Sequence, residues 1–301
     1  MLDQISSARA QDSTAPSRGF APFEPRLPGV TAGLGYVTPM AERAYVHMYQ
    51  PPAGVAWTNC EYRMHEVRIA DARAMAMPPD LDREGFSLWD APTGLSDFSD
   101  EDRIRRHYYA EAAELAKLAT GADQAFVFDH AIRRRESGRP ALNFGRDGDG
   151  NSLGAVGRVH NDYSDASGRR RQESVAATRQ LSPDWQRFAI VNIWRSIRGK
   201  VLDTPLALCD ARTISAVDPA VTELRYRDRT GEIYQLHHAR RHRWAYFSEL
   251  DGHEALVFKQ YDSQLSGVAR FTPHAAFDLP EIPPDIPLRV SIEIRCLVTY
   301  R

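Results

Sequence analysis

The sequence lacks several features that would mark whole classes of protein. Its three cysteines are an odd number without C-x-x-C spacing, which argues against a disulfide framework and indicates reduced thiols. No apolar run approaches the ~18 residues of a membrane span, and the polar first twenty residues contain no signal-peptide core. No G-x-x-x-x-G-K phosphate loop occurs, which argues against a nucleotide site of that type. We therefore expect a cytoplasmic protein that does not enter a membrane.

Charge is nearly balanced along the 301 residues. The 38 Lys and Arg residues face 40 Asp and Glu residues, so the net charge is −2 and no basic excess attracts a nucleic-acid backbone. Three short basic runs, at residues 133–135, 169–171 and 240–243, are interpreted as solvated loops. Arginine-rich loops also favour an anionic or carboxylated substrate, with Arg240 and Arg241 as candidates. The expected partner is a small molecule, and a homodimer is left open.

Turn-forming residues divide the chain into an arm and one domain. Residues 1–38 are rich in Ser, Ala, Gly and Pro and are expected to be irregular or partly disordered, with a single domain over 39–301. Helices are predicted over 100–120, which ends at a capping glycine, and over 173–181. Strands are predicted at residues 44–49, 60–67, 125–132, 187–197, 206–209, 232–238, 244–247, 255–261 and 290–300, and a glycine-rich loop at 145–150.

The order of these elements indicates the fold class. The first two strands are expected to form an antiparallel pair. Strands bounded by turns dominate the second half of the chain, where long helices do not alternate with them. This pattern argues against a doubly wound sheet and favours a mainly β fold with flanking helices, built as a sandwich or barrel.

The segment His160-Asn161-Asp162 is the strongest chemical signal in the sequence. Side chains on a strand repeat with period two, so the imidazole and the carboxylate share one face, where a distant histidine can complete a 2-His-1-carboxylate iron site. About one H-x-D or H-x-E triplet is expected by chance, and the alternative is a histidine satisfied by hydrogen bonds at a strand end. Candidates for the third ligand are His237, His238, His242, His253 and His274. His242 and His253 are expected in exposed turns, whereas His274, one strand before an arginine, suits the role.

The last predicted strand offers an anchor for a carboxylate. Arg289 and Ser291 share one face of this strand, and a guanidinium fork with a neighbouring hydroxyl can hold a carboxylate. Arg295 lies on the same face and is the runner-up anchor. The structural alternatives are an exposed strand-end arginine at position 289 and an ion pair between Glu293 and Arg295.

Five stretches carry a resemblance to a known family. They are VHNDY (159–163), FAIVNIWR (188–195), PLALCD (205–210), FKQYDS (258–263) and FTPH (271–274). Over about residues 85–301 the chain resembles the bacterial and fungal secondary-metabolism oxygenases related to aspergillic acid hydroxylase. That family includes gibberellin-desaturase-like and cephem-methoxylation-like enzymes and the novofumigatonin endoperoxygenase.

The resemblance implies a double-stranded β-helix core of the jelly-roll, cupin-like type, together with Fe(II) and 2-oxoglutarate. It matches His160, Asp162 and His274 to the iron ligands, and the Arg289-x-Ser291 pair to a carboxylate-binding R-x-S motif. The Pro-rich stretch between His274 and Arg289 is longer than usual, so the choice between Arg289 and Arg295 stays open.

The function predicted from these residues and the resemblance is oxygenation of a small natural-product-type substrate by Fe(II), 2-oxoglutarate and O₂. Hydrogen abstraction would lead to hydroxylation, desaturation or oxidative cyclisation. Tyr163, which follows the metal carboxylate, and Asn192 and Trp194, which share a strand face, are the candidates for substrate binding, or else belong to the core. The alternatives are an iron oxidase that does not use 2-oxoglutarate and a non-catalytic β-barrel binding or accessory protein.

Overall fold

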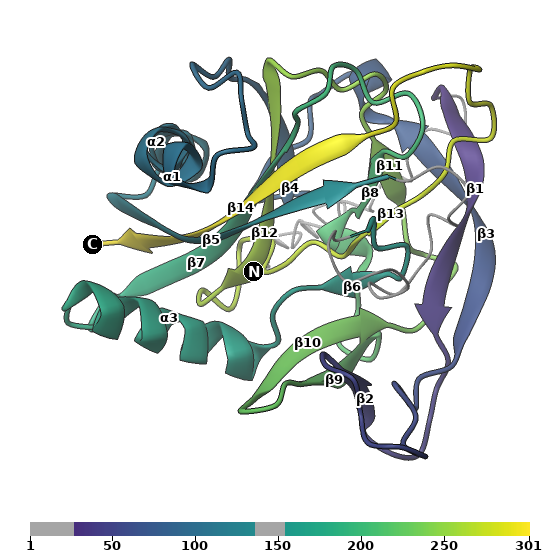
Figure 1. Ribbon diagram of the computed structural model, residues 1–301, viewed down its shortest axis with the longest axis horizontal. Helices are drawn as coiled ribbons and strands as arrows, with labels where there is room; N and C mark the ends of the chain where they lie inside the picture. Colours follow the sequence, from purple (N-terminus) through teal and green to yellow (C-terminus); the bar gives the residue numbers. More distant parts are fainter. Residues whose placement is uncertain (1–26, 136–153) are drawn as a thin grey trace, which may run out of the picture.

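Two curved β-sheets dominate the computed structural model, which describes residues 27–135 and 154–301 (Figure 1). The larger sheet has nine strands in the order β1-β3-β11-β8-β13-β6-β10-β9-β2. Its strands are β1 (Gly29–Val37), β2 (Ala44–His47), β3 (Tyr62–Asp71), β6 (His160–Asn161), β8 (Leu206–Cys209), β9 (Pro219–Arg225), β10 (Thr230–Leu236), β11 (Trp244–Tyr246) and β13 (His274–Ala276). The glycine-rich loop predicted at 145–150 lies outside the described residues.

The smaller sheet has five strands in the order β4-β12-β7-β14-β5, each antiparallel to its neighbours. These strands are β4 (Phe86–Asp90), β5 (Gln124–Arg134), β7 (Arg187–Ser196), β12 (Glu254–Asp262) and β14 (Val290–Tyr300). Short 3-10 turns occur at Ala72–Ala74 and Ala211–Thr213. The predicted mainly β fold with a jelly-roll core is confirmed.

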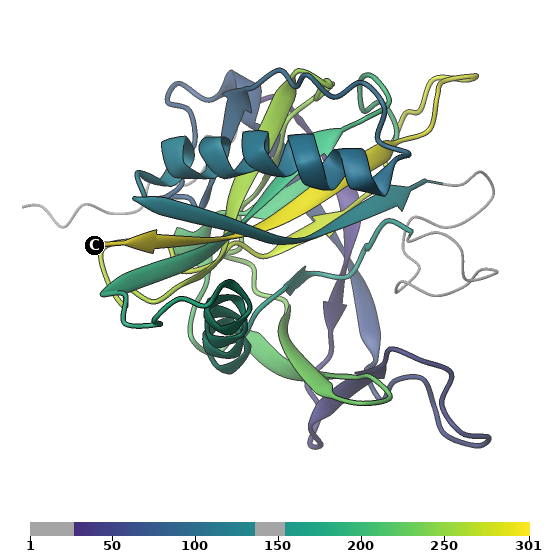
Figure 2. The same ribbon diagram turned by 60° about the vertical axis from the view of Figure 1, so that its left-hand side comes forward.

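The helix predicted over 100–120 is confirmed and covers the outer face of the smaller sheet. It consists of α1 (Glu101–Arg103), a π turn (Ile104–Tyr108) and α2 (Tyr109–Thr120), and Figure 2 shows α2 lying across β5 and β14. Asp100 caps its first turn and Gly121 ends it with φ 66°. Buried apolar residues of α2, β7, β12 and β14 form one cluster there. The inner face of this sheet is therefore left to face the nine-stranded sheet.

Residues 29–37 differ from the prediction of an irregular arm over 1–38, because they form β1. This strand pairs with β3 along its whole length, from Gly29 opposite Ala70 to Val37 opposite Tyr62. Glycine within the segment allows the close pairing: a Cβ at Gly29 would lie 2.3 Å from the carbonyl oxygen of Ile69. The antiparallel pair predicted for the first two strands is wrong, since β2 pairs with β9 in parallel and β3 pairs with β1.

The second helix begins eight residues earlier than predicted. Helix α3 spans Asp165–Arg179 and starts at Ser164, whose side chain accepts a hydrogen bond from the backbone of Ser167 while the Ser167 hydroxyl accepts one from the backbone of Ser164. This capping box uses serine where the familiar pattern has Glu or Gln, so the sequence pattern missed it. The basic run 169–171 consequently lies in a helix, and Arg133 and Arg134 lie in β5, rather than in solvated loops.

Candidate metal centre and adjoining cavity

The structure brings His160, Asp162 and His274 together between the two sheets. His160 on β6 and His274 on β13 are paired directly across adjacent strands, and Asp162 follows two residues after His160. One ligand atom from each of the three lies within 4.8 Å of the others. Two imidazoles and one carboxylate at this spacing can hold a metal ion on one side and leave its other side open.

The two histidines are oriented by backbone carbonyl groups. His160 Nδ1 lies 2.8 Å from the oxygen of Arg158, and His274 Nδ1 lies 3.2 Å from the oxygen of Thr272. A proton on each Nδ1 leaves Nε2 as the metal-binding nitrogen, the arrangement usual for metal-binding histidines. Burial and the neighbouring His274 hold the pKa of His160 well below its usual value, so this imidazole is neutral and able to bind a cation.

The carboxylate of Asp162 is held by one oxygen and left available at the other. Asn192 Nδ2 donates to Oδ2 at 3.0 Å and Arg295 Nε donates to it at 3.1 Å, whereas Oδ1 lies 3.6 Å from His160 Nε2. Burial by itself would raise the pKa of Asp162, but Arg295, the two neighbouring histidines and the hydrogen bond from Asn192 together outweigh it and bring the pKa well below the usual range. Asp162 is therefore ionised, with Oδ1 directed at the histidines.

The backbone of the metal-site strand is fixed by Gln260 on β12. Its Oε1 accepts a hydrogen bond from Asp162 N at 2.8 Å, and its carbonyl oxygen accepts one from Asn161 Nδ2 at 2.9 Å. The pairing of β12 with β7 shifts between Lys259 and Tyr261, where Gln260 is inserted. Such a bulge redirects a side chain, here toward the metal-site strand. Gln260 lies in one of the family-like stretches, but nothing in the sequence indicated this role.

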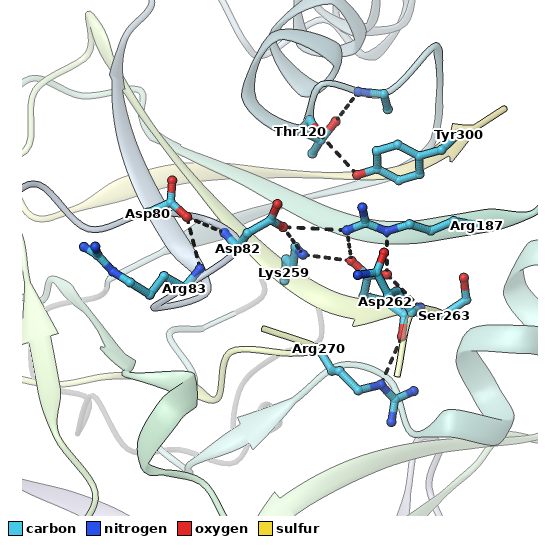
Figure 3. A network of polar contacts seen from close by, with 12 residues as sticks. Asp80, Asp82, Arg83, Thr120, Arg187, Lys259, Asp262, Ser263, Arg270 and Tyr300 are labelled. Atoms are coloured by element: carbon cyan, nitrogen blue, oxygen red, sulfur yellow. Dashed lines mark hydrogen bonds and ion pairs between the residues drawn. The ribbon is translucent and has the colours of Figure 1, made fainter. Parts of the chain in front are cut away.

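A partly buried network of charges lies beside this bulge (Figure 3). Lys259 Nζ donates to Asp262 Oδ2 at 2.8 Å and to Asp82 Oδ1 at 2.5 Å, and Arg187 donates to Asp262 at 2.6 Å. Lys259 and Asp262 are fully buried, so each needs its partners to offset the loss of water. The network links β7, β12 and the segment before β4 next to the bulge at Gln260.

Arg289 and Ser291 form a buried polar pair without a full set of partners. Arg289 Nη1 donates to the carbonyl oxygen of Thr204 at 2.8 Å, and its guanidinium carbon lies 5.7 Å from the centre of the Trp194 ring. Arg289 Nε and Ser291 Oγ are buried and have no hydrogen-bond partner among the described residues. Burial lowers the pKa of Arg289 to about 10, so the group stays protonated at neutral pH. An incoming carboxylate would satisfy both groups.

Arg295 is instead committed to acidic side chains of the protein. Besides its bond to Asp162, it donates to Asp129 Oδ2 at 3.0 Å and to Glu293 Oε1 at 2.9 Å. The ion pair between Glu293 and Arg295, which was one of the structural alternatives, is therefore present. The geometry favours Arg289 over Arg295 as the carboxylate anchor.

A cavity of about 770 Å³ opens beside the triad and is lined by His160, Asp162 and Tyr163. Tyr163 therefore lies where a substrate-binding residue is expected. Asn192 and Trp194 share the inner face of β7 as predicted, but neither lines this cavity. Asn192 donates a hydrogen bond to Asp162, and Trp194 packs in a buried apolar cluster next to Arg289. Their contact with substrate stays a prediction.

The other histidine candidates lie elsewhere. His253 is exposed, as expected. His242 was expected in an exposed turn but is buried, with Nδ1 3.1 Å from the Tyr36 hydroxyl and Nε2 3.2 Å from Asp218. The adjacent arginines misled the prediction, because Arg241 turns outward and pairs with Asp218. Arg133 was also misjudged: it is on β5, opposite Ser291, and lines the cavity.

Comparisons with known proteins identify the family. The family model described as an oxidoreductase/YMDC permease-like domain matches residues 34–299. No helix in the described part of the chain is long and apolar enough to cross a membrane. The chain is 30% identical over 260 residues to the Fe(II)/2-oxoglutarate-dependent dioxygenase nvfI of Aspergillus novofumigatus, covering 82% of this chain and 88% of that protein. It is 29% identical over 267 residues to the hydroxylase/desaturase CTB9 of Cercospora beticola, covering 80% and 78%.

Solved structures give the same result. The iron and alpha-ketoglutarate-dependent endoperoxidase NvfI superposes with a TM-score of 0.77 at 28% identity, over 90% of this chain and 98% of that one. These similarities favour 2-oxoglutarate-dependent chemistry over the two alternatives left open by the sequence. The fold, the His-Asp-His cluster and the relatives agree, and the chain belongs to the family of Fe(II)/2-oxoglutarate-dependent dioxygenases, which use Fe(II), 2-oxoglutarate and O₂.

Proposed function

We propose that His160, Asp162 and His274 bind the catalytic Fe(II), and that Arg289 with Ser291 binds the distal carboxylate of 2-oxoglutarate. The observation that carries the proposal is the convergence of three ligand atoms within 4.8 Å. The buried Arg289 Nε and Ser291 Oγ, which have no partner among the described residues, support the second part. A buried guanidinium without a carboxylate is costly, and the cosubstrate would supply the missing acceptor.

The iron centre with its cosubstrate supplies an oxidant that removes hydrogen from a bound substrate. The protein's part is to hold the ligands in the correct state and direction. Carbonyl groups turn each histidine's Nε2 inward, and Asn192 and Arg295 keep Asp162 ionised and bound through Oδ2. Phe258 packs edge-on against the ring of His274, with 4.9 Å between the ring centres, and gives this imidazole an apolar neighbour.

We propose that the cavity of about 770 Å³ binds a small natural-product-type substrate. A cavity of this volume suits a ligand of several rings rather than a macromolecule. The relatives are named hydroxylase/desaturase and endoperoxidase, so hydroxylation, desaturation and oxidative cyclisation all fall within the proposed chemistry. Tyr163, at the junction of the cavity and the triad, is proposed to contact the substrate.

Anaerobic titration of the metal-free protein with Fe(II) and then 2-oxoglutarate tests the proposal. A keto acid chelated to a facial-triad iron gives a weak visible absorption band. We expect the band in the wild type, its loss in His274→Ala, and its retention in His253→Ala, the matched variant at an exposed histidine. In Arg289→Gln the band should form only at a higher 2-oxoglutarate concentration, roughly 100-fold, because the charged fork is lost. A normal band in His274→Ala would refute the ligand assignment.

A further inference from the structure

The charges that line the cavity are unequal in sign. Its lining includes six arginines, Arg133, Arg158, Arg170, Arg171, Arg229 and Arg295, against three acidic residues, Asp129, Asp162 and Glu232. Such an excess of positive charge in a concave site favours a negatively charged ligand. Whether the excess is available depends on how these side chains are paired.

The acidic residues of the lining are already engaged. Asp129 and Asp162 both pair with Arg295, at 3.0 Å and 3.1 Å. Glu232 pairs with Arg43 at 2.6 Å and accepts a hydrogen bond from the Ser164 hydroxyl. Each of these three carboxylates therefore has a partner other than Arg133, Arg170 and Arg171.

Two of those arginines come from α3. Arg170 and Arg171 line the cavity, and neither forms an ion pair with a carboxylate among the described residues. The guanidinium carbon of Arg171 lies 4.8 Å from the centre of the Phe128 ring. This cation–π contact positions the side chain and does not involve a carboxylate. Arg133 approaches from β5, with Nη1 donating to the carbonyl oxygen of Gly154 at 3.2 Å. In Figures 1 and 2, β5 lies above β6, and α3 follows β6 along the chain.

The rest of the cavity lining has a different character. The elements β2, β9 and β10 and the residues next to them contribute five apolar side chains, Val46, Met48, Trp57, Leu224 and Ile233, together with polar ones that include His47, Arg229 and Glu232. A ligand that filled this space could lay an apolar body against the five apolar side chains and present a polar group to the arginines of α3 and β5.

We propose that the substrate is an amphipathic organic anion, whose oxyanion is bound by Arg170 and Arg171, with Arg133 on the facing strand, while its apolar body lies against the β2, β9 and β10 wall. The proposal rests on the proposed function, since it takes this cavity as the substrate site. Guanidinium groups bind carboxylate and phosphate oxygens in a planar fork, so either oxyanion satisfies the chemistry. The arginines at 240 and 241, favoured from sequence, do not line the cavity.

Calorimetric titration with three matched probes tests the proposal. The probes are 1-naphthoate, 1-naphthyl phosphate and the neutral 1-naphthamide, and the protein is loaded with Mn(II) and 2-oxoglutarate. We expect at least one anionic probe to bind about tenfold or more tightly than the amide, as for a charge-assisted contact. The tighter of the two anions identifies the oxyanion. The double variant Arg170→Gln, Arg171→Gln should reduce binding of that anion by about tenfold and leave the amide unchanged.

Arg169→Gln is the matched control, because Arg169 is the preceding residue of the same helix and does not line the cavity. Its probe affinities should equal those of the wild type. Equal binding of anions and amide, no binding of any probe, or an equal loss in Arg169→Gln would overturn the proposal. Repeating the titration on metal-free protein separates this result from the iron assignment, because a preference for anions there does not depend on the triad.

Discussion

The two faces of β14 carry side chains of opposite kinds. The face toward α2 is apolar and fully buried, with Ile292, Ile294, Cys296 and Val298 in one cluster. The face toward the nine-stranded sheet carries Ser291, Glu293 and Arg295, and Arg289 lies just before the strand. Arg289, Glu293 and Arg295 form the polar contacts described above, whereas Ser291 Oγ has no partner within residues 27–135 and 154–301. Because strand side chains alternate, one segment supplies both faces without a change in backbone.

The difference between the two faces indicates how the fold offsets the unfavourable burial of charged groups at the site. Taking charges out of water is expensive even when they are paired, and Arg289 Nε has no acceptor in the part of the chain that the structure describes. The apolar face offsets this cost, because the burial of each large aliphatic side chain stabilises the folded state by about 1.5–3 kcal/mol. We infer that the outer face of β14 sets stability and that its inner face sets ligand binding.

Substitution on the outer face should give the largest change in stability. Ile294→Ala removes a fully buried side chain from the cluster against α2 and is expected to lower the free energy of unfolding by about 2–5 kcal/mol. Urea unfolding measures this change. Fe(II) affinity of the folded variant should equal that of the wild type. Ser291→Ala, the matched inner-face variant, should show the reverse: little change in stability and weaker 2-oxoglutarate binding. Weakened iron binding in Ile294→Ala would contradict the separation of the two faces.

Substitution on the inner face of β7 should give a smaller effect, confined to the metal. Asn192→Ala removes the donor at 3.0 Å from Asp162 Oδ2, and loss of such an outer contact usually lowers metal affinity by about 10–100-fold. Competition with a chelator of known affinity measures the change. Ser196→Ala is the control, because Ser196 lies further along the same face and its hydroxyl donates to the Gly199 carbonyl at 2.5 Å. Equal losses in both variants would mean that Asn192 acts only through packing.

Much of the site was accessible to sequence reasoning because its chemistry is local in the chain. The H-x-D spacing brought together His160 and Asp162, although β6 ends at Asn161 and Asp162 lies just after it. The R-x-S spacing placed Arg289 and Ser291 two residues apart at the start of β14. The mainly β architecture followed from turn spacing in the same way. Bringing His274 to the pair required a contact between distant strands, for which the family resemblance was the stronger guide.

What escaped prediction depends on tertiary contacts. Asn192 and Trp194 were correctly placed on one strand face, but only the packed sheets show that they support Asp162 and Arg289. The proposed preference for Arg289 over Arg295 rests on which guanidinium already has acidic partners, and this depends on neighbours in space. Local composition was equally uninformative for Gly29–Val37, because its pairing partner β3 lies some thirty residues on.

Buried histidines extend the comparison to the nine-stranded sheet. His160 and His242 are both buried and both have a pKa below the usual value, yet only His160 belongs to the proposed metal site. Burial lowers the pKa of His242, although Asp218 opposes the shift, and Tyr36, Arg241 and His238 are the other polar groups near it. His242 should therefore contribute to stability rather than to chemistry.

The shift of the His242 pKa determines whether the free energy of unfolding rises or falls with pH. His242 has a lower pKa folded than unfolded, so the unfolded chain binds its proton first as pH falls below about 6.5, and stability decreases from there downward. In His242→Gln the free energy of unfolding should fall less steeply between about pH 7 and about pH 5, as followed by urea titration at each pH. His253→Gln, at an exposed histidine, should keep the wild-type slope. An unchanged slope in His242→Gln would show that this buried histidine takes up its proton without loss of stability. Burial alone would then not distinguish a histidine that stabilises the fold, such as His242, from a proposed metal ligand, such as His160.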